Sequence, residues 1–233
     1  MLPNLSSLWP RIAQAISDER LALYQSRANG DPQQMLRLYM WNILLCESLY
    51  PLLNLTEVTL RNRLDSGLAE MFGRRDWFNL DWLDARDATK VRDAQARIIR
   101  SHRIPTPGRV IAELTFGFWA SLLDVRYERT HILWPHLAPQ VFACAPRKLR
   151  SRKAQSRLAA SARDLRNRVF HHEPIWHWPH LPEVVNDAAR WLDGLSPEAA
   201  VMGRLLDRFH QIFNAGPQPV TSQSRHPSAT RLG

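Results

Sequence analysis

The stretch QQMLRLYMWNILLCESLYPLLNLTEVTLRNRLDSGLAEMF, residues 33–72, decides the fold class. Its second half carries an apolar side chain at every fourth position, which places these side chains on one face of an α-helix. They are Leu60, Leu64, Leu68 and Phe72. The first half is apolar on many sides, so we expect a buried core helix that Pro51 kinks or divides and Gly73 ends.

Helical spacing continues along the rest of the chain, and hardly any run alternates like a strand. We therefore predict an all-α helical bundle with few glycine breaks. Phe118 and Trp119 lie in an almost uncharged segment and should sit at the centre of this bundle. The further helices that we expect cover residues 7–27, 85–101, 110–127, 148–170 and 183–213.

The 233 residues are compatible with one main domain. The breaker Asn29-Gly30-Asp31-Pro32 suggests an N-terminal helix and linker over residues 1–32, followed by a helical domain over residues 33–213. Residues 214–233 are polar, contain several prolines and have no hydrophobic period, so we expect a disordered tail.

The chain has two cysteines, Cys46 and Cys144, whose separation predicts neither a disulfide framework nor a thiolate zinc site. The N-terminus does not resemble a signal peptide, and we expect a cytoplasmic protein. Residues 36–55 are apolar enough to suggest a membrane span but contain several polar or helix-breaking residues. These are Arg37, Asn42, Glu47, Ser48 and Pro51. A core helix, and no membrane partner, is the favoured interpretation.

The surplus of positive charge is local. Residues 146–168, PRKLRSRKAQSRLAASARDLRNR, contain nine Lys or Arg residues against Asp164 alone, so the segment carries 9 − 1 = +8 of the total charge of +9. A concentrated basic helix attracts phosphates, and RNA is the expected partner, although most charge runs are solvated helix faces. The residues predicted to bind RNA are Lys148, Arg150, Arg152, Lys153, Arg157, Arg163 and Arg168.

The basic helix leads into the candidate catalytic segment, DLRNRVFHHEPI at residues 164–175. Pro174 cannot extend a helix, so the helix should end near His171. The negative end of the helix dipole favours a cation there, which suits a histidine acting as a general acid. Arg166 suits a phosphate because its planar fork donates to two oxygens, and Asn167 suits the orientation of a neighbour.

These groups support cleavage of RNA by its own 2′-hydroxyl, with His171 or His172 as acid or base and no metal cofactor. Residues five apart on a regular helix point about 140° away from each other. Arg166 and His171 therefore converge only if the helix unwinds or if two chains share each site. The alternative for all four residues, Arg166, Asn167, His171 and His172, is ordinary capping, packing and solvation.

A metal site is a weaker alternative. His171, His172, His177 and His180 are close in sequence, but HEPIWH has neither the HExxH spacing nor a continuous helical turn across Pro174. Trp176 and Trp178 are expected to pack within a rigid connector, although an aromatic side chain there could stack on an unpaired base.

The segment LRNRVFHHEPI resembles the Abi-like (abortive infection) family, a branch of the HEPN superfamily marked by an arginine, a polar residue and a histidine four to six positions on. The likeness continues through SLYPLLNLTEVTLRNRL, FGRRDWF and PTPGRVIAELTFGFWASLL, and it covers most of residues 33–192. In the family-like block at 56–62, Glu57 could approach the site, although an ion pair with Arg61 is the simpler interpretation.

The resemblance implies a HEPN-like helical bundle with additional helices, a homodimer with a composite site, and metal-independent endoribonuclease activity in phage defence or as a toxin with an antitoxin partner. The alternative is a non-catalytic helical module that binds RNA or a protein in such a system. A third hypothesis is one half of a two-component system whose partner modifies or silences it.

Overall fold

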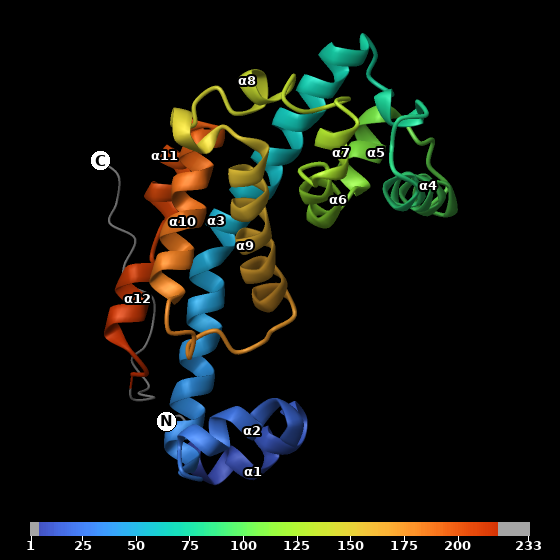
Figure 1. Ribbon diagram of the computed structural model, residues 1–233. Coiled ribbons are helices and arrows are strands. Elements are labelled where there is room, and N and C mark those ends of the chain that lie inside the picture. The colour runs from blue at the N-terminus through green and yellow to red at the C-terminus, as the bar shows by residue number, and fades with distance from the viewer. Residues whose placement is uncertain (1–4, 219–233) are drawn as a thin grey trace, which may run out of the picture. The chain divides into compact units, whose positions relative to one another are not determined.

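The computed structural model describes residues 5–218, and its regular structure is helical throughout that range (Figure 1). No strand forms among these residues, so the predicted all-α class is confirmed. Residues 219–233, most of the predicted tail, lie outside the described range. The elements are α1 (Leu5–Ile16), α2 (Asp18–Arg27), α3 (Pro32–Phe72), η1 (Trp77–Asn79), α4 (Ala85–Arg100), α5 (Pro107–Glu113), α6 (Phe116–Ser121), α7 (Arg126–Arg129), α8 (Ala138–Val141), η2 (Arg147–Leu149), α9 (Arg152–Phe170), α10 (Leu181–Leu195), α11 (Pro197–Leu206) and α12 (Phe209–Ala215).

The chain divides into two compact units. The first unit comprises Met1–Leu49, Arg168–Pro179 and Arg208–Gly233, and the second comprises Tyr50–Asn167 and His180–Asp207. The long helix α3 contributes its N-terminal part to the first unit and its C-terminal part to the second. An 18-residue window of α3 reaches a mean hydropathy of 1.2, long and apolar enough to cross a membrane, and 33% of it is buried; core helices of soluble proteins meet the same criteria.

In the first unit, α1 and α2 pack against the start of α3 (Figure 1). Leu21, Tyr24 and Met35 form the centre of this cluster, because helical spacing turns their apolar side chains to one side. Trp176, from the connector after α9, packs against the same cluster. Trp41 of α3 donates from its indole N–H to the carbonyl of Ile212, 3.0 Å away, and so attaches α12.

The second unit holds the larger core, to which the C-terminal part of α3 contributes Leu60, Leu64 and Leu68. Phe118 and Trp119 are fully buried in it, which confirms their predicted position. Helices α9 and α10 lie side by side (Figure 1), and the buried amide of Gln155 accepts a 2.6 Å hydrogen bond from the Trp191 indole.

A buried carboxylate fastens α4 within the second unit. Asp87 is fully buried and accepts hydrogen bonds from Tyr127 Oη (2.7 Å), Ser121 Oγ (2.7 Å) and Lys90 Nζ (2.8 Å). Burial by itself raises the pKa of Asp87, but the hydrogen bonds from Lys90, Tyr127 and Ser121 outweigh it and leave the pKa below its ordinary value. The cluster therefore holds an ionised carboxylate in the core.

Pro51 does not divide α3, which is continuous over 41 residues. The proline removes one hydrogen bond to the preceding turn, whereas Leu49 and Leu53 on either side are buried and hold the helix in place. Gly73 ends α3 as predicted. It adopts a positive φ of 66°, Gly73 N–H donates to Glu70, and Arg74 N–H donates to Ala69, which is the Schellman arrangement.

Three of the expected helices are each divided, so these predictions of continuous helices were wrong. The expected helix at 7–27 breaks at Ser17 (φ 85°), and the one at 110–127 breaks at Leu114 and Thr115, both extended. The one at 183–213 breaks at Ser196, which is extended before Pro197 and caps α11 through Ala199 N–H. The expected helix at 148–170 begins as η2, and α9 proper starts at Arg152.

Candidate active site

Helix α9 presents Arg166 and Asn167 from the second unit. The buried side of this helix is formed by small and apolar side chains, including Ala159, Ala162 and Leu165. Helical spacing then leaves Arg166 and Asn167 half-buried at the flank of this side.

Arg166 is paired with a carboxylate of α3. Its Nε lies 3.3 Å from Oε2 of Glu57, and the two side chains are only 28% and 25% exposed. Arg61 instead directs its Nε to the Asn62 side chain at 3.2 Å, so the simpler interpretation of Glu57 as the partner of Arg61 was wrong. Partial burial and the ion pair with Glu57 leave the Arg166 guanidinium fewer conformations than it would have in solvent.

Helix α9 ends at Phe170, within one residue of the prediction. His172 has a positive φ of 58°, its N–H donates to the Val169 carbonyl, and Glu173 N–H donates to the Arg168 carbonyl at 2.9 Å. This is again the Schellman arrangement, with a histidine where glycine is most common. Both His171 and His172 are exposed immediately after the helix.

A left-handed histidine is not confined to this segment. His102 has a φ of 56° and ends α4 with the same two hydrogen bonds, from His102 to Ile99 and from Arg103 to Ile98. Histidine tolerates this backbone region better than most side chains do. The conformation of His172 is therefore a helix-ending feature, and any catalytic role must rest on its imidazole.

The turn after α9 is held from two helices of the first unit. Arg20 of α2 donates to the carbonyls of His171 (3.3 Å) and His172 (3.2 Å). Asn42 of α3 accepts from Ile175 N–H at 2.8 Å and donates to the Glu173 carbonyl at 3.4 Å. Neither contact was predicted, although an asparagine in the middle of an apolar helix was a signal that could have drawn attention to Asn42.

The connector beyond the turn is packed, as expected for its tryptophans. Arg168 pairs with Glu173 at 3.1 Å and lies over the Trp178 ring, 5.0 Å from its centroid. Burial lowers the pKa of His177, and the positive charges of Arg168 and Arg27 lower it further. His177 Nδ1 is buried without a hydrogen-bond partner. Between residues 5 and 218, no three of His, Cys, Asp and Glu are placed to hold a metal ion.

The predicted RNA-binding residues fall into two groups. Lys148, Lys153 and Arg157 are exposed, whereas Arg163 is half-buried 3.8 Å from Asp164 and Arg168 is half-buried beside Glu173 and Trp178. Arg150, by contrast, donates to the carbonyls of Ala145 and Ala143, both at 2.7 Å. Arg152 donates to Glu128 and to the Leu123 carbonyl and is only 11% exposed. Arg150 and Arg152 therefore hold the fold.

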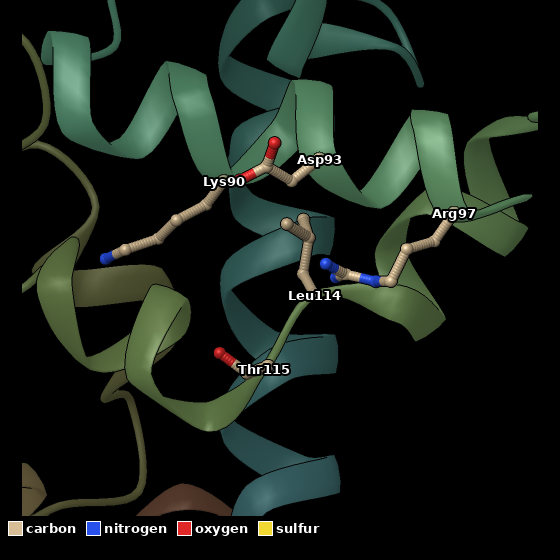
Figure 2. A pocket seen from close by; sticks show the side chains of 5 residues that line it. All are labelled: Lys90, Asp93, Arg97, Leu114 and Thr115. Atoms are coloured by element: carbon tan, nitrogen blue, oxygen red, sulfur yellow. The ribbon is translucent and has the colours of Figure 1, made fainter.

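The second unit also has a surface pocket of about 110 Å³ near α4, lined by Lys90, Asp93, Arg97, Leu114 and Thr115 (Figure 2). Figure 2 shows the guanidinium of Arg97 reaching toward Leu114, whereas the Lys90 side chain points away from it. Arg97 is paired with Glu113 at 2.7 Å and Lys90 with Asp87 at 2.8 Å. The pocket includes none of the predicted site residues.

The structure thus places Arg166 and Asn167 in the second unit, with Glu57, and His171 and His172 in the first unit, with Arg20. No protein-family model, curated protein or solved structure matches the chain significantly.

Proposed function

We propose that the chain is a metal-independent endoribonuclease of the HEPN type that acts in the cytoplasm, in phage defence or as a toxin with an antitoxin partner. One observation carries the proposal. A single short segment first supplies an arginine held by a carboxylate, and then ends its helix so that two exposed imidazoles follow. Phosphate binding and proton transfer need these two kinds of group.

Each residue has a separate role in the proposed reaction. Arg166 binds the scissile phosphate and stabilises its developing charge, and Glu57 orients the guanidinium. The 2′-oxygen attacks the phosphorus and the bond from phosphorus to the 5′-oxygen breaks, which leaves a 2′,3′-cyclic phosphate and a 5′-hydroxyl. One imidazole, of His171 or His172, removes the 2′-hydroxyl proton or protonates the leaving 5′-oxygen, and water carries out the other proton transfer. Asn167 orients a neighbouring group. The attacking nucleophile belongs to the RNA, so the mechanism requires no cofactor.

The exposed cations of α9 and of the preceding turn provide the proposed RNA contacts. Lys153 and Arg157 are four residues apart, so they lie on one side of the helix, and Lys148 precedes it. Such charges contact the phosphate backbone and bind without sequence preference. Arg150 and Arg152 contribute through the fold because their guanidinium groups are committed to protein oxygens.

The direct test is incubation of the purified protein with total RNA in excess chelator. Wild type is expected to cut RNA, and Arg166→Ala and His171→Ala are expected to lose cleavage. His172 is best replaced by glycine as well as alanine, because glycine keeps the left-handed turn. Cleavage that persists in all of these variants would reject the site.

A composite site in a homodimer is part of the proposal, and mixing variants tests it. If each site takes Arg166 from one chain and a histidine from the other, dimers of Arg166→Ala with His171→Ala contain one intact site. The mixture then regains about a quarter of wild-type cleavage, because about half of randomly paired dimers are mixed. If both groups come from the same chain, the mixture stays inactive.

The second candidate function is a non-catalytic module that binds RNA or a protein partner. The observation that favours it is that His102 ends α4 with the same two hydrogen bonds, so the left-handed turn at His172 does not by itself point to catalysis. Binding of RNA with a strong salt dependence, without any cleavage, would select this function.

A further inference from the structure

We propose that Asn42 and Arg20 are positioning residues that fix the direction of the His171 and His172 side chains. This proposal rests on the proposed function for its catalytic meaning, but its structural content can be tested separately. It gives the N-terminal helices, for which the sequence suggested no role, a part in the candidate site.

Asn42 is the central contact. Its side chain is 5% exposed, within the apolar part of α3, where an amide is costly to bury unless its hydrogen bonds are made. Both ends of the amide are used by the turn, since Oδ1 accepts from Ile175 N–H and Nδ2 donates to the Glu173 carbonyl. The amide therefore fixes the backbone on both sides of Pro174.

Arg20 acts on the other side of the same turn. Its Nη1 donates to the carbonyls of His171 and His172, which follow the last residue of α9. Carbonyls at a helix C-terminus lack intrahelical partners and carry the negative end of the helix dipole. A cationic donor satisfies both requirements, so Arg20 stabilises the turn in the conformation described.

The anchoring of the turn extends into the first-unit core. Ile175 is fully buried, and Trp176 packs against Tyr24 and Trp41 at centroid distances of 6.0 and 6.3 Å. The backbone from His171 to Ile175 is thus held by α2, α3 and the packed connector. Because the two imidazoles are themselves exposed, their direction depends on this backbone support.

The variants for the test are Asn42→Asp, which turns a second oxygen toward the Glu173 carbonyl, and Arg20→Gln, which removes an exposed cation with little risk to folding. Arg20→Lys restores a cationic donor and should rescue Arg20→Gln. Asn54→Asp, an exposed change on α3, and Arg11→Gln, an exposed change on α1, are matched controls.

The first measurement is independent of RNA. Exchange of the amide hydrogens of His172, Glu173 and Ile175 should rise about tenfold in Asn42→Asp and Arg20→Gln. The ring resonances of His171 and His172 should shift, while those of His136 stay unchanged. Unchanged exchange and unchanged resonances in Arg20→Gln, or in a folded Asn42→Asp, would overturn the proposal whatever the activity.

The second measurement uses single-turnover RNA cleavage. We expect the cleavage rate constant of both variants to fall about tenfold, with RNA affinity within about twofold and with recovery in Arg20→Lys. Wild type that cuts no RNA would end the proposed function but leave the exchange and resonance results to decide the positioning. Cleavage that falls only in proportion to the folded fraction would reduce both residues to structural roles and overturn the proposal.

Discussion

Glu57 of α3 and Arg166 of α9 are 109 residues apart in sequence, and their Oε2 and Nε atoms are 3.3 Å apart in the structure. Both lie in the second unit, where the pair joins two helices next to a fully buried Leu165. A half-buried arginine with a fixed partner is preorganised, so less rotamer entropy is lost when it binds a phosphate.

The pair predicts a specific effect of Glu57→Gln. The amide keeps the size of the side chain but removes the charge that orients Arg166, so we expect the rate of RNA cleavage to fall about 10- to 100-fold with a small change in RNA affinity. Single-turnover kinetics measures both quantities. Glu70→Gln, an exposed change on the same helix, is the control and should leave the rate unaltered.

The backbone conformation of His172 and its imidazole can be tested separately. Replacement by glycine relieves the left-handed strain and should raise the free energy of unfolding by up to about 1 kcal/mol, whereas alanine should give no gain. Chemical denaturation checks this order. His102→Gly is the matched change at the other Schellman turn and should give a similar gain with full cleavage activity. A catalytic imidazole requires His172→Gly to be stable but inactive.

Asp87→Asn should destabilise the second unit by about 2–4 kcal/mol. The amide can no longer accept from Tyr127, Ser121 and Lys90 together, and it leaves the Lys90 charge without its closest partner. Thermal or urea unfolding measures the loss, with the exposed Asp93→Asn on the same helix as control. Equal stability of the two variants would contradict the importance of the buried cluster.

The lowered pKa of His177 predicts that the chain loses stability on mild acidification. Burial and the charges of Arg168 and Arg27 hold its pKa below the ordinary value of 6.5, so the folded chain binds fewer protons than the unfolded chain. The stability that the neutral imidazole contributes is fully present above pH 6.5, the pKa of His177 in the unfolded chain. It declines as the pH falls toward the lower pKa of the folded chain. His177→Gln should reduce the decline in unfolding free energy between about pH 7.5 and about pH 5.5, whereas His136→Gln, at an exposed position, should not.

The salt dependence of RNA binding tests the role of α9. Lys153→Gln combined with Arg157→Gln removes two exposed cations, so the slope of log affinity against log salt should become shallower by about 1.4 if each contacts one phosphate of single-stranded RNA. Arg86→Gln with Arg92→Gln neutralises two exposed cations of α4 and serves as the comparison. A similar change of slope in both pairs would mean that RNA binding is not confined to the basic helix.

Local chemistry explains which parts of the structure could be predicted. Pro174 excludes continuation of α9, and the end at Phe170 followed from that alone. The breaks at Ser17 and Ser196 were missed because apolar spacing continues across them, although Ser196 before Pro197 and Glu198 is a capping signal. The helix-breaking effect of Pro51 was overestimated, because its buried neighbours Leu49 and Leu53 keep α3 continuous.

The partners of polar side chains were harder to predict than the helices. Glu57 could reach Arg61 one turn away or an unknown residue far along the chain, and only the packing of α3 against α9 selects Arg166. The same holds for Asn42 and the backbone of Glu173 and Ile175, more than 130 residues away. Sequence patterns identify such side chains as polar groups in apolar helices, but they do not identify the distant residues with which these side chains pair.

The positive φ of His172 has a consequence for how such a segment can vary. A helical residue points in a direction set by its number, since each position adds about 100° to the rotation. A residue in the left-handed conformation, such as His172, no longer follows this rotation, so the geometry of the turn sets the direction of its side chain. The number of residues between Arg166 and His172 is therefore not dictated by helical pitch alone, and the direction of the His172 imidazole depends on where α9 ends, which Pro174 determines.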